Sequence, residues 1–153
     1  MQSYINVRAE DPTSQDAKDL MDLLSDTLKS ITGDSGENSF DITNVCVPRS
    51  LFVIARNQDG EPLGCGAIRP IDNNTAELKR MFAISKSNGV GSAILAYLEK
   101  QSLNLGYTKI WLETRLVNQK AISFYENMGF QRITNYGKYL NREECVCLGK
   151  FLN

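Results

Sequence analysis

The sequence predicts one α+β domain over residues 1–153, with a mixed, mostly antiparallel sheet and flanking helices. Two successive hairpin patterns between residues 51 and 84 predict an antiparallel meander. A strand–helix–strand pattern over residues 75–114 then predicts one parallel pair. The length of 153 residues and the 42% hydrophobic content suit a single packed core.

The N-terminal part predicts a strand followed by a helix. Tyr4–Arg8 alternates weakly and is typical of a first strand, and Asp11–Ser14 supplies residues that favour a helix start. Apolar residues then recur at helical spacing, at Ala17, Leu20, Met21, Leu24, Leu28 and Ile31. Gly33 is expected to end the helix, because glycine adopts the left-handed conformation at little cost. The polar stretch that follows, Gly33–Ser39, is expected to be a flexible loop.

The middle of the chain predicts three consecutive antiparallel strands. Leu51–Arg56 and Leu63–Ile71 are apolar β-type runs separated by Asn57–Gly60, which contains the Asp-Gly pair favoured in hairpins. Asp72–Asn74 supplies a second turn and leads into a third strand, Thr75–Ile84.

The second half predicts a crossover and the end of the sheet. A helix from about Gly89 to Leu105, stopped by Gly106, connects Thr75–Ile84 to a short strand, Lys109–Thr114. These two strands should be parallel, with a right-handed crossover. A further helix and two strands complete the domain, over Asn118–Met128, Phe130–Thr134 and Cys145–Phe151.

Composition excludes several classes of function. The sequence has no histidine, which removes Ser-His-Asp and Cys-His nucleophiles, His-ligated zinc and histidine bases. We therefore expect no metal site, and acid–base chemistry must use carboxylates, Tyr, Lys or Cys. The net charge of −1 gives no attraction to nucleic acid or to an anionic membrane. The four cysteines are expected to be small buried thiols in a reducing compartment.

The hydropathy pattern predicts a soluble, cytoplasmic protein. The first residues do not form a charged leader followed by an apolar run. No stretch approaches the length of apolar sequence that a membrane span needs.

A glycine-containing loop, Lys86–Ser92, lies between a predicted strand and the start of a predicted helix. Unpaired N–H groups and the positive end of the helix dipole make such a position an anion site. Gly89 and Gly91 would let the backbone approach a diphosphate, although a tight turn is the favoured explanation of a lone G-x-G pattern. Ile94 breaks the dinucleotide fingerprint, and the sequence contains no P-loop motif.

Two segments together carry a resemblance to a known family. Lys86-x-x-Gly89-x-Gly91 resembles the R/Q-x-x-G-x-G/A loop of the GNAT superfamily of acyl-CoA N-acyltransferases. The segment Asn118–Phe130 resembles that family's N-x-x-A-x-x-[FL]-Y-x-x-x-G-F segment. The similarity runs from about Leu63 to Leu152 in the right order, and Lys86 departs from the usual Arg or Gln. A lysine still binds diphosphate as a point charge.

The resemblance implies a GNAT-like fold with acetyl-CoA as co-substrate. In such a fold the strands Thr75–Ile84 and Lys109–Thr114 splay apart, and the pantetheine arm pairs with the exposed edge of the first strand. A backbone N–H near Met81–Ala83 would polarise the thioester carbonyl. The implied co-substrate contacts are Met81, Phe82, Ala83, Lys86, Ser87, Asn88, Gly89, Val90, Gly91, Ser92 and Asn118. Asn118 is also expected to cap its helix.

The resemblance further implies direct transfer of the acetyl group to a bound amine in a ternary complex. The family position that assists the departing thiolate falls on Tyr125. Complete proton transfer from a tyrosine of pKa ~10 to a thiolate of pKa ~8.5 is uphill by ~2 kcal/mol, so Tyr125 is expected to act as a hydrogen-bond donor. The alternative is a tyrosine that only fills the helix face beside Phe124 and Met128.

Two glutamates are candidates for the base that deprotonates the amine. Simple alternation along the strand places Ala76, Leu78, Phe82 and Ile84 on one face. Glu77 would then lie on the other face with Met81 and is the first candidate, whereas Glu113 is the second. The alternative for Glu77 is a surface or ion-paired carboxylate, with Lys79 or Arg115 as partner. Water could also serve as the base.

Taken together, these features predict an N-acetyltransferase that acts on a primary amine of a small molecule. The acceptor would be selected by the first helix, by Gly33–Asn44 and by Tyr136–Tyr139, and the sequence does not name it. The alternatives are an acyl-CoA-binding regulatory domain without turnover and a protein or peptide N-acetyltransferase. We expect a monomer or homodimer with no nucleic-acid or membrane partner.

Overall fold

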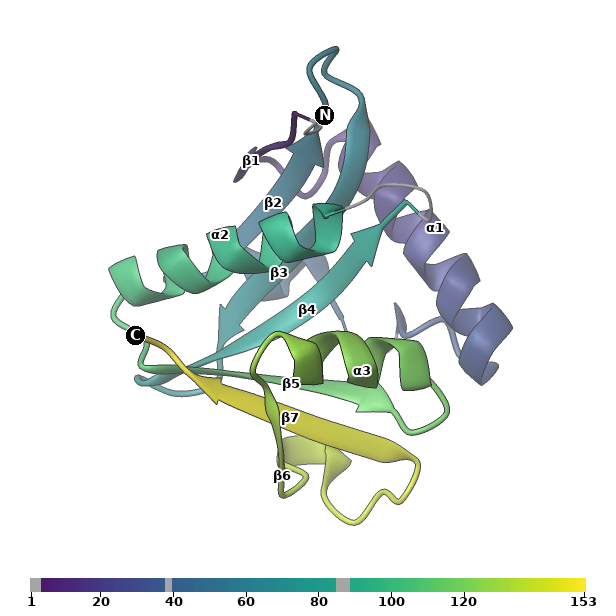
Figure 1. Ribbon diagram of the computed structural model, residues 1–153, viewed down its shortest axis with the longest axis vertical. Helices are drawn as coiled ribbons and strands as arrows, with labels where there is room; N and C mark the ends of the chain where they lie inside the picture. The colour runs from purple at the N-terminus through teal and green to yellow at the C-terminus, as the bar shows by residue number, and fades with distance from the viewer. Residues whose placement is uncertain (1–3, 38–39, 85–88) are drawn as a thin grey trace.

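A seven-stranded sheet with strand order β1-β2-β3-β4-β5-β7-β6 organises the chain. The computed structural model describes residues 4–37, 40–84 and 89–153 (Figure 1). The strands are β1 Asn6–Ala9, β2 Leu51–Arg56, β3 Pro62–Pro70, β4 Thr75–Ala83, β5 Lys109–Arg115, β6 Gln131–Ile133 and β7 Cys145–Phe151. The helices are α1 Gln15–Thr32, α2 Val90–Asn104 and α3 Gln119–Asn127, with 3-10 turns η2 Ile42–Val45 and η3 Gly137–Tyr139. The α+β class, the meander and the crossover are confirmed.

Capping residues fix the ends of α1 and the start of α3. The Ser14 side chain accepts a hydrogen bond from the Ala17 N–H at 3.1 Å, and Gly33 ends α1 in the left-handed conformation, as the sequence predicted. The Asn118 side chain accepts from the Ala121 N–H at 3.3 Å, which confirms its predicted cap. The loop after α1 contains a 3-10 turn, η2, that the sequence did not reveal.

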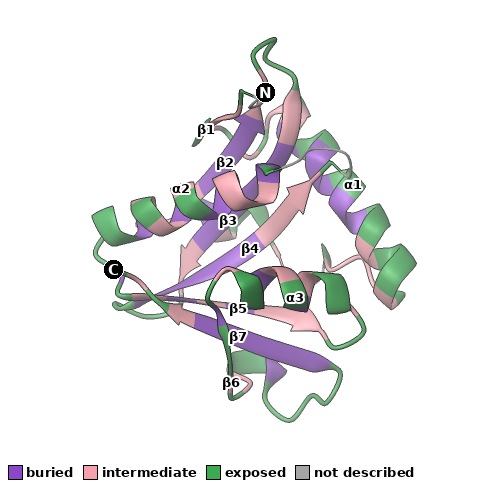
Figure 2. Ribbon diagram, viewed as in Figure 1, coloured by how far each residue is buried: buried purple, intermediate pink, exposed green. Residues whose placement is uncertain are grey.

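The helices cover the two faces of the sheet (Figures 1 and 2). On one face α2 and α3 bury the larger apolar cluster, which includes Ile94, Leu98 and Ile122. On the other face α1 packs Ala17, Leu20 and Met21 against residues of β2 and β3. Both faces of the central strands are therefore covered, as their long buried stretches require.

The parallel pair β4–β5 is short. The two strands pair only over Thr75–Glu77 and Lys109–Trp111, and beyond these residues they separate. This is the splay that the family resemblance implied. The sheet is therefore closed at one end of β4 and open at the other (Figure 1).

An irregularity in β4 overturns the predicted side-chain alternation. Arg80 has φ +53°, and the register against β3 shifts between Cys65 and Ala67. Because a bulge adds one residue, the side chains beyond Arg80 change faces. Met81 packs against the α2 cluster and Phe82 against the α1 cluster, so Met81 does not share a face with Glu77. The prediction that placed Phe82 beside Leu78 was wrong.

The strand β7 lies between β5 and β6 and pairs antiparallel with both. Its Cys145 and Cys147 are buried, as is Cys65, whereas Cys46 is exposed and departs from the prediction of buried thiols. All four thiols are free. Within the described ranges, no helix has the length and hydropathy needed to cross a bilayer.

Candidate active site

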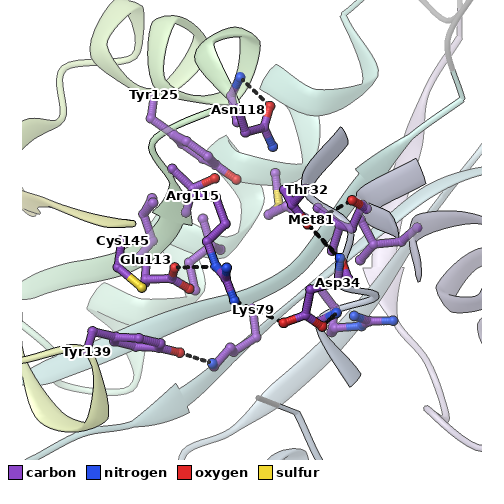
Figure 3. Close-up of a pocket in the computed structure, with 18 of the residues that line it drawn as sticks. Thr32, Asp34, Lys79, Met81, Glu113, Arg115, Asn118, Tyr125, Tyr139 and Cys145 are labelled. Carbon is purple, nitrogen blue, oxygen red and sulfur yellow. Dashed lines mark hydrogen bonds and ion pairs between the residues drawn. The ribbon is translucent and has the colours of Figure 1, made fainter. Parts of the chain in front are cut away.

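A cleft of about 300 Å³ lies where β4 and β5 separate. Because the strands part here, side chains from both faces of the sheet reach the same space. Tyr125 and Asn118 enter from α3, whereas Glu113, Lys79 and Tyr139 lie toward the opposite end (Figure 3). The backbone of β4 from residue 78 to 81 forms one wall.

Tyr125 combines a packed ring with a hydroxyl at the cleft. Its ring lies edge-on to Phe124 and Phe130, with centroid separations of 5.1 and 5.5 Å. The residue is 8% exposed, and its hydroxyl has no hydrogen-bond partner among the described residues. Burial raises the pKa of Tyr125, so the hydroxyl keeps its proton and can donate it to an acceptor in the cleft. The core position and the donor function expected from the sequence are compatible.

Gly89 precedes α2 as its N-cap residue, in the left-handed conformation. This residue has φ +82°, and a side chain built there would meet nothing within 4 Å, so its backbone is accessible. Gly91 has a different reason: a Cβ there would lie 3.3 Å from the Phe124 ring, so glycine allows α2 and α3 to approach. Val90 and Ser92 begin the helix, whereas Lys86, Ser87 and Asn88 lie outside the described residues.

The three β4 residues predicted to contact acetyl-CoA point in different directions. Met81 lines the cleft. Phe82 packs toward α1, and Ala83 pairs with Gly64 of β3 at the end of the strand. Only Met81 therefore brings a side chain to the cleft, and any role of Phe82 and Ala83 would fall to their backbone.

Glu113 is the buried carboxylate of the cleft. Its side chain is 14% exposed, and Oε2 lies 3.9 Å from Arg115 Nε yet accepts no hydrogen bond from the described residues. Burial raises the pKa of Glu113, an effect that a hydrogen bond from Cys145 and the charges of Lys79 and Arg115 partly offset. An acid with a raised pKa and an unused oxygen is suited to accept a proton.

Glu77 lies nearby on β4 but is not part of the cleft wall. The residue is 2% exposed, and both carboxylate oxygens are occupied. Arg69 Nε donates to Oε1 at 2.7 Å, and the Tyr136 hydroxyl donates to Oε2 at 2.6 Å. Lys79 Nζ lies 3.7 Å from Oε1. The ion-paired alternative raised for Glu77 therefore describes its surroundings, with Arg69 as the main partner.

An ion pair that the sequence did not reveal joins the two sides of the cleft. Arg115 Nη2 lies 2.9 Å from Asp34 Oδ2, and so connects β5 to the loop that follows α1 (Figure 3). Cys145 and Arg142 also line the cleft without having been predicted. Sequence spacing carries no signal for such contacts, because the β5–β7 pairing and the loop position create them.

Solved structures with a similar fold include acetyltransferases. An acetyltransferase of Streptococcus agalactiae aligns over 97% of this chain and 98% of its own, at TM-score 0.77 and 21% identity. A GNAT family acetyltransferase of Elizabethkingia anophelis, solved with acetyl-CoA bound, aligns over 99% and 100% at TM-score 0.71 and 18% identity. At 18–21% identity, these likenesses show that the chain shares its fold with proteins of the acetyltransferase class.

The sequence places the chain within that class. Residues 17–130 match the acetyltransferase (GNAT) family, and the chain belongs to this family. An uncharacterized N-acetyltransferase of Schizosaccharomyces pombe is 29% identical over 92 residues, which cover 58% of this chain and 56% of the relative. The chain spans about half the length of the curated relatives it matches.

Proposed function

We propose that this protein transfers an acetyl group from acetyl-CoA to a primary amine of a small molecule. The observation that carries the proposal is the cleft between the splayed strands, which Tyr125 and Glu113 enter from opposite faces of the sheet. A hydrogen-bond donor and a proton acceptor are the two groups that direct transfer to an amine needs.

The described residues fit acetyl-CoA in two respects. Gly89 gives open backbone at the N-terminus of α2, where N–H groups and the helix dipole favour a diphosphate. The edge of β4 beyond Glu77 is not paired with β5, which leaves room for an extended chain to lie along it. Acetyl-CoA would supply an activated thioester there.

Glu113 is the residue we assign as the base. The amine nitrogen forms a bond to the acetyl carbon while the carbon–sulfur bond breaks, and Glu113 takes the proton that the nitrogen loses. The carboxylate has an oxygen without a hydrogen bond, whereas both oxygens of Glu77 are occupied by partners. This difference favours Glu113 over Glu77, which was the first candidate from the sequence.

Tyr125 is assigned as the donor to the sulfur of the leaving CoA. Its hydroxyl retains its proton because burial raises the pKa of Tyr125. A hydrogen bond to a charged group contributes about 1.5–3 kcal/mol, so donation alone stabilises the thiolate substantially. Asn118 caps α3 about two helical turns before Tyr125 and so fixes the start of the helix that carries it.

The two alternative functions have less support. A regulatory domain that only binds acyl-CoA needs neither a buried carboxylate nor a tyrosine hydroxyl directed at the same cleft. A protein substrate calls for an open groove, whereas this cleft measures about 300 Å³ and is crossed by the Arg115–Asp34 ion pair. We therefore propose a small acceptor.

The proposal is tested in two stages. Thermal unfolding with and without CoA measures binding, and saturating CoA should raise the unfolding temperature. Release of free thiol from acetyl-CoA across a panel of amines then measures turnover. CoA binding without thiol release from any amine would favour the regulatory alternative, and absence of both would overturn the proposal.

A further inference from the structure

The wall of the cleft is rich in positive charge. Five cationic side chains line it within the described residues, and they are Lys79, Arg80, Arg115, Lys138 and Arg142. Of the residues that the structure describes, two carboxylates line the same space, Asp34 and Glu113. The whole chain carries a net charge of −1, so this local excess is not a property of the overall composition.

Two of the cations have their charge or donors committed inside the protein. Arg80 Nη2 donates to Met21 O at 3.0 Å and to Ser25 Oγ at 2.7 Å, which ties β4 to α1. Arg115 is paired with Asp34 at 2.9 Å. These two residues stabilise the walls. Lys79 is also engaged, because its Nζ lies 3.7 Å from Glu77 Oε1 and donates to the Tyr139 hydroxyl at 3.0 Å, which leaves Lys138 and Arg142.

Lys138 and Arg142 are the exposed cations that line the cleft. Both are exposed, and neither forms an ion pair with a described residue. They belong to the segment around η3, which packs on the face of the sheet that also carries Glu113. The cleft therefore carries positive charge at Lys138 and Arg142 and a carboxylate at Glu113.

The η3 segment is held firmly in place. Asn135 Nδ2 donates to the backbone oxygens of Tyr139, Arg142 and Cys145, at 3.0–3.2 Å. The Tyr136 hydroxyl donates to Glu77 at 2.6 Å, and Lys79 Nζ donates to the Tyr139 hydroxyl at 3.0 Å. The segment therefore presents Lys138 and Arg142 from a fixed backbone rather than from an unsupported loop.

We infer that the acceptor is an amine that also carries an anionic group, such as a carboxylate, as an amino acid does. The amine would face Glu113, and the anion would lie between Lys138 and Arg142. A guanidinium binds a carboxylate or a phosphate in a bidentate manner, and an ammonium adds a point charge. This inference rests on the proposed function and narrows its substrate class.

The test compares matched amines that differ only in charge. Each carboxylate-bearing amine, for example L-alanine, is paired with its carboxamide, and one phosphate-bearing amine is added to separate the two anions. Thiol release is expressed per concentration of unprotonated amine, because the carboxamide lowers the pKa of the amine. We expect kcat/KM to be at least about tenfold higher for the anionic member of each pair, which corresponds to about 1.4 kcal/mol.

A double variant tests whether Lys138 and Arg142 cause the preference for anionic amines. Lys138→Ala with Arg142→Ala should reduce the anionic-to-neutral ratio of kcat/KM about tenfold. Arg132→Ala removes an exposed charge from β6, away from the cleft, and should leave the ratio unchanged. A preference retained in full by the double variant would overturn the inference.

Failure of this inference is distinguishable from failure of the proposed function. Neutral and anionic amines acetylated equally would overturn the inference alone. If CoA binds but no amine turns over, ligand-observed NMR on the CoA complex compares binding of the same pairs, and equal binding again overturns it.

Discussion

A glutamate lies at each end of the β4–β5 pair, and the two glutamates differ in how their carboxylate oxygens are hydrogen-bonded. At the closed end Glu77 is 2% exposed and has a partner for each oxygen. At the open end the Glu113 side chain is 14% exposed, and its buried Oε2 accepts no hydrogen bond within the described chain. The partners of Glu77 stabilise its charged form and occupy both of its oxygens. Glu113 keeps one oxygen that can accept a proton or a hydrogen bond from a ligand. We propose that the separation of the two strands determines which glutamate serves as the base.

The largest expected effect comes from removing the glutamate at the closed end. Glu77→Ala leaves the Tyr136 hydroxyl and the charge of Arg69 without their acceptor, and breaking a buried ion pair costs about 3–5 kcal/mol. Urea unfolding should therefore show a loss in this range. Glu99→Ala, which removes the half-buried partner of Lys150, should cost about 1 kcal/mol or less. A loss for Glu77→Ala no larger than for this control would contradict the comparison.

The glutamate at the open end should control activity instead. Glu113→Gln removes the proposed base, and loss of general-base catalysis typically lowers the rate by about 10²-fold or more. Burial raises the pKa of Glu113, so the acidic limb of the kcat/KM profile should lie above the range of an ordinary glutamate and disappear in the variant. Glu126→Gln, an exposed change on α3, is the matched control. An unaltered acidic limb in Glu113→Gln would assign the base elsewhere.

The pH dependence of stability provides a second comparison between the wild type and Glu113→Gln. Because the folded pKa of Glu113 is raised above its unfolded value of about 4.3, its contribution to stability is complete below that pH. The contribution is lost as pH rises through the folded pKa. Relative to Glu113→Gln, the wild type should therefore lose stability between pH 4 and neutral pH, as measured by urea unfolding across that range. A constant difference at all pH values would mean that Glu113 does not titrate in this way.

A smaller loss of activity is expected at the tyrosine that enters the open end. Tyr125→Phe keeps the ring that packs on Phe124 and Phe130 and removes only the hydroxyl. Turnover should fall about 10- to 100-fold, matching the loss of one hydrogen bond to a charged group, while CoA affinity stays unchanged. Tyr97→Phe on α2 is the matched control. Full turnover in Tyr125→Phe would remove Tyr125 from the mechanism.

The smallest expected effect is a difference in CoA binding between alanine variants of two glycines with nearly the same φ. Gly89 and Gly60 have φ of +82° and +83°, and a Cβ at either would meet nothing within 4 Å. Alanine at either position should therefore cost about 1–2 kcal/mol of stability, because both need the left-handed conformation. Only Gly89→Ala should also weaken CoA binding, measured by the thermal shift with CoA. Equal CoA affinity in the two variants would argue against a phosphate site at the start of α2.

Local patterns predicted most of the secondary structure, because hairpin turns, caps and apolar spacing act over a few residues. The cap at Asn118, the left-handed end at Gly33 and the parallel crossover are all confirmed. The alternation along β4 failed at Arg80, because the bulge there is stabilised by contacts to α1 from residues far away in the sequence. No pattern within the strand marks it.

The sequence predicted several of the residues that line the candidate site, but it did not predict which glutamate has a free oxygen there. Tyr125, Asn118, Met81 and Glu113 do line one cleft, as the family resemblance led us to expect. The sequence favoured Glu77 over Glu113, since it shows neither that Arg69 and Tyr136 occupy the first nor that the strands separate beside the second. These are properties of tertiary pairing, and local periodicity does not contain them.

The position of β7 has a consequence for how the domain assembles. This strand comes after every other element along the chain, yet it lies inside the sheet and supplies the pairing edge for both β5 and β6. During vectorial synthesis, the half that carries α1, α2 and the closed end of the sheet emerges well before β7. The neighbourhood of Glu113, and the η3 wall with its two cations, can form only after β7 has inserted between its neighbours. The surface proposed to select the acceptor thus takes shape after the closed end of the sheet.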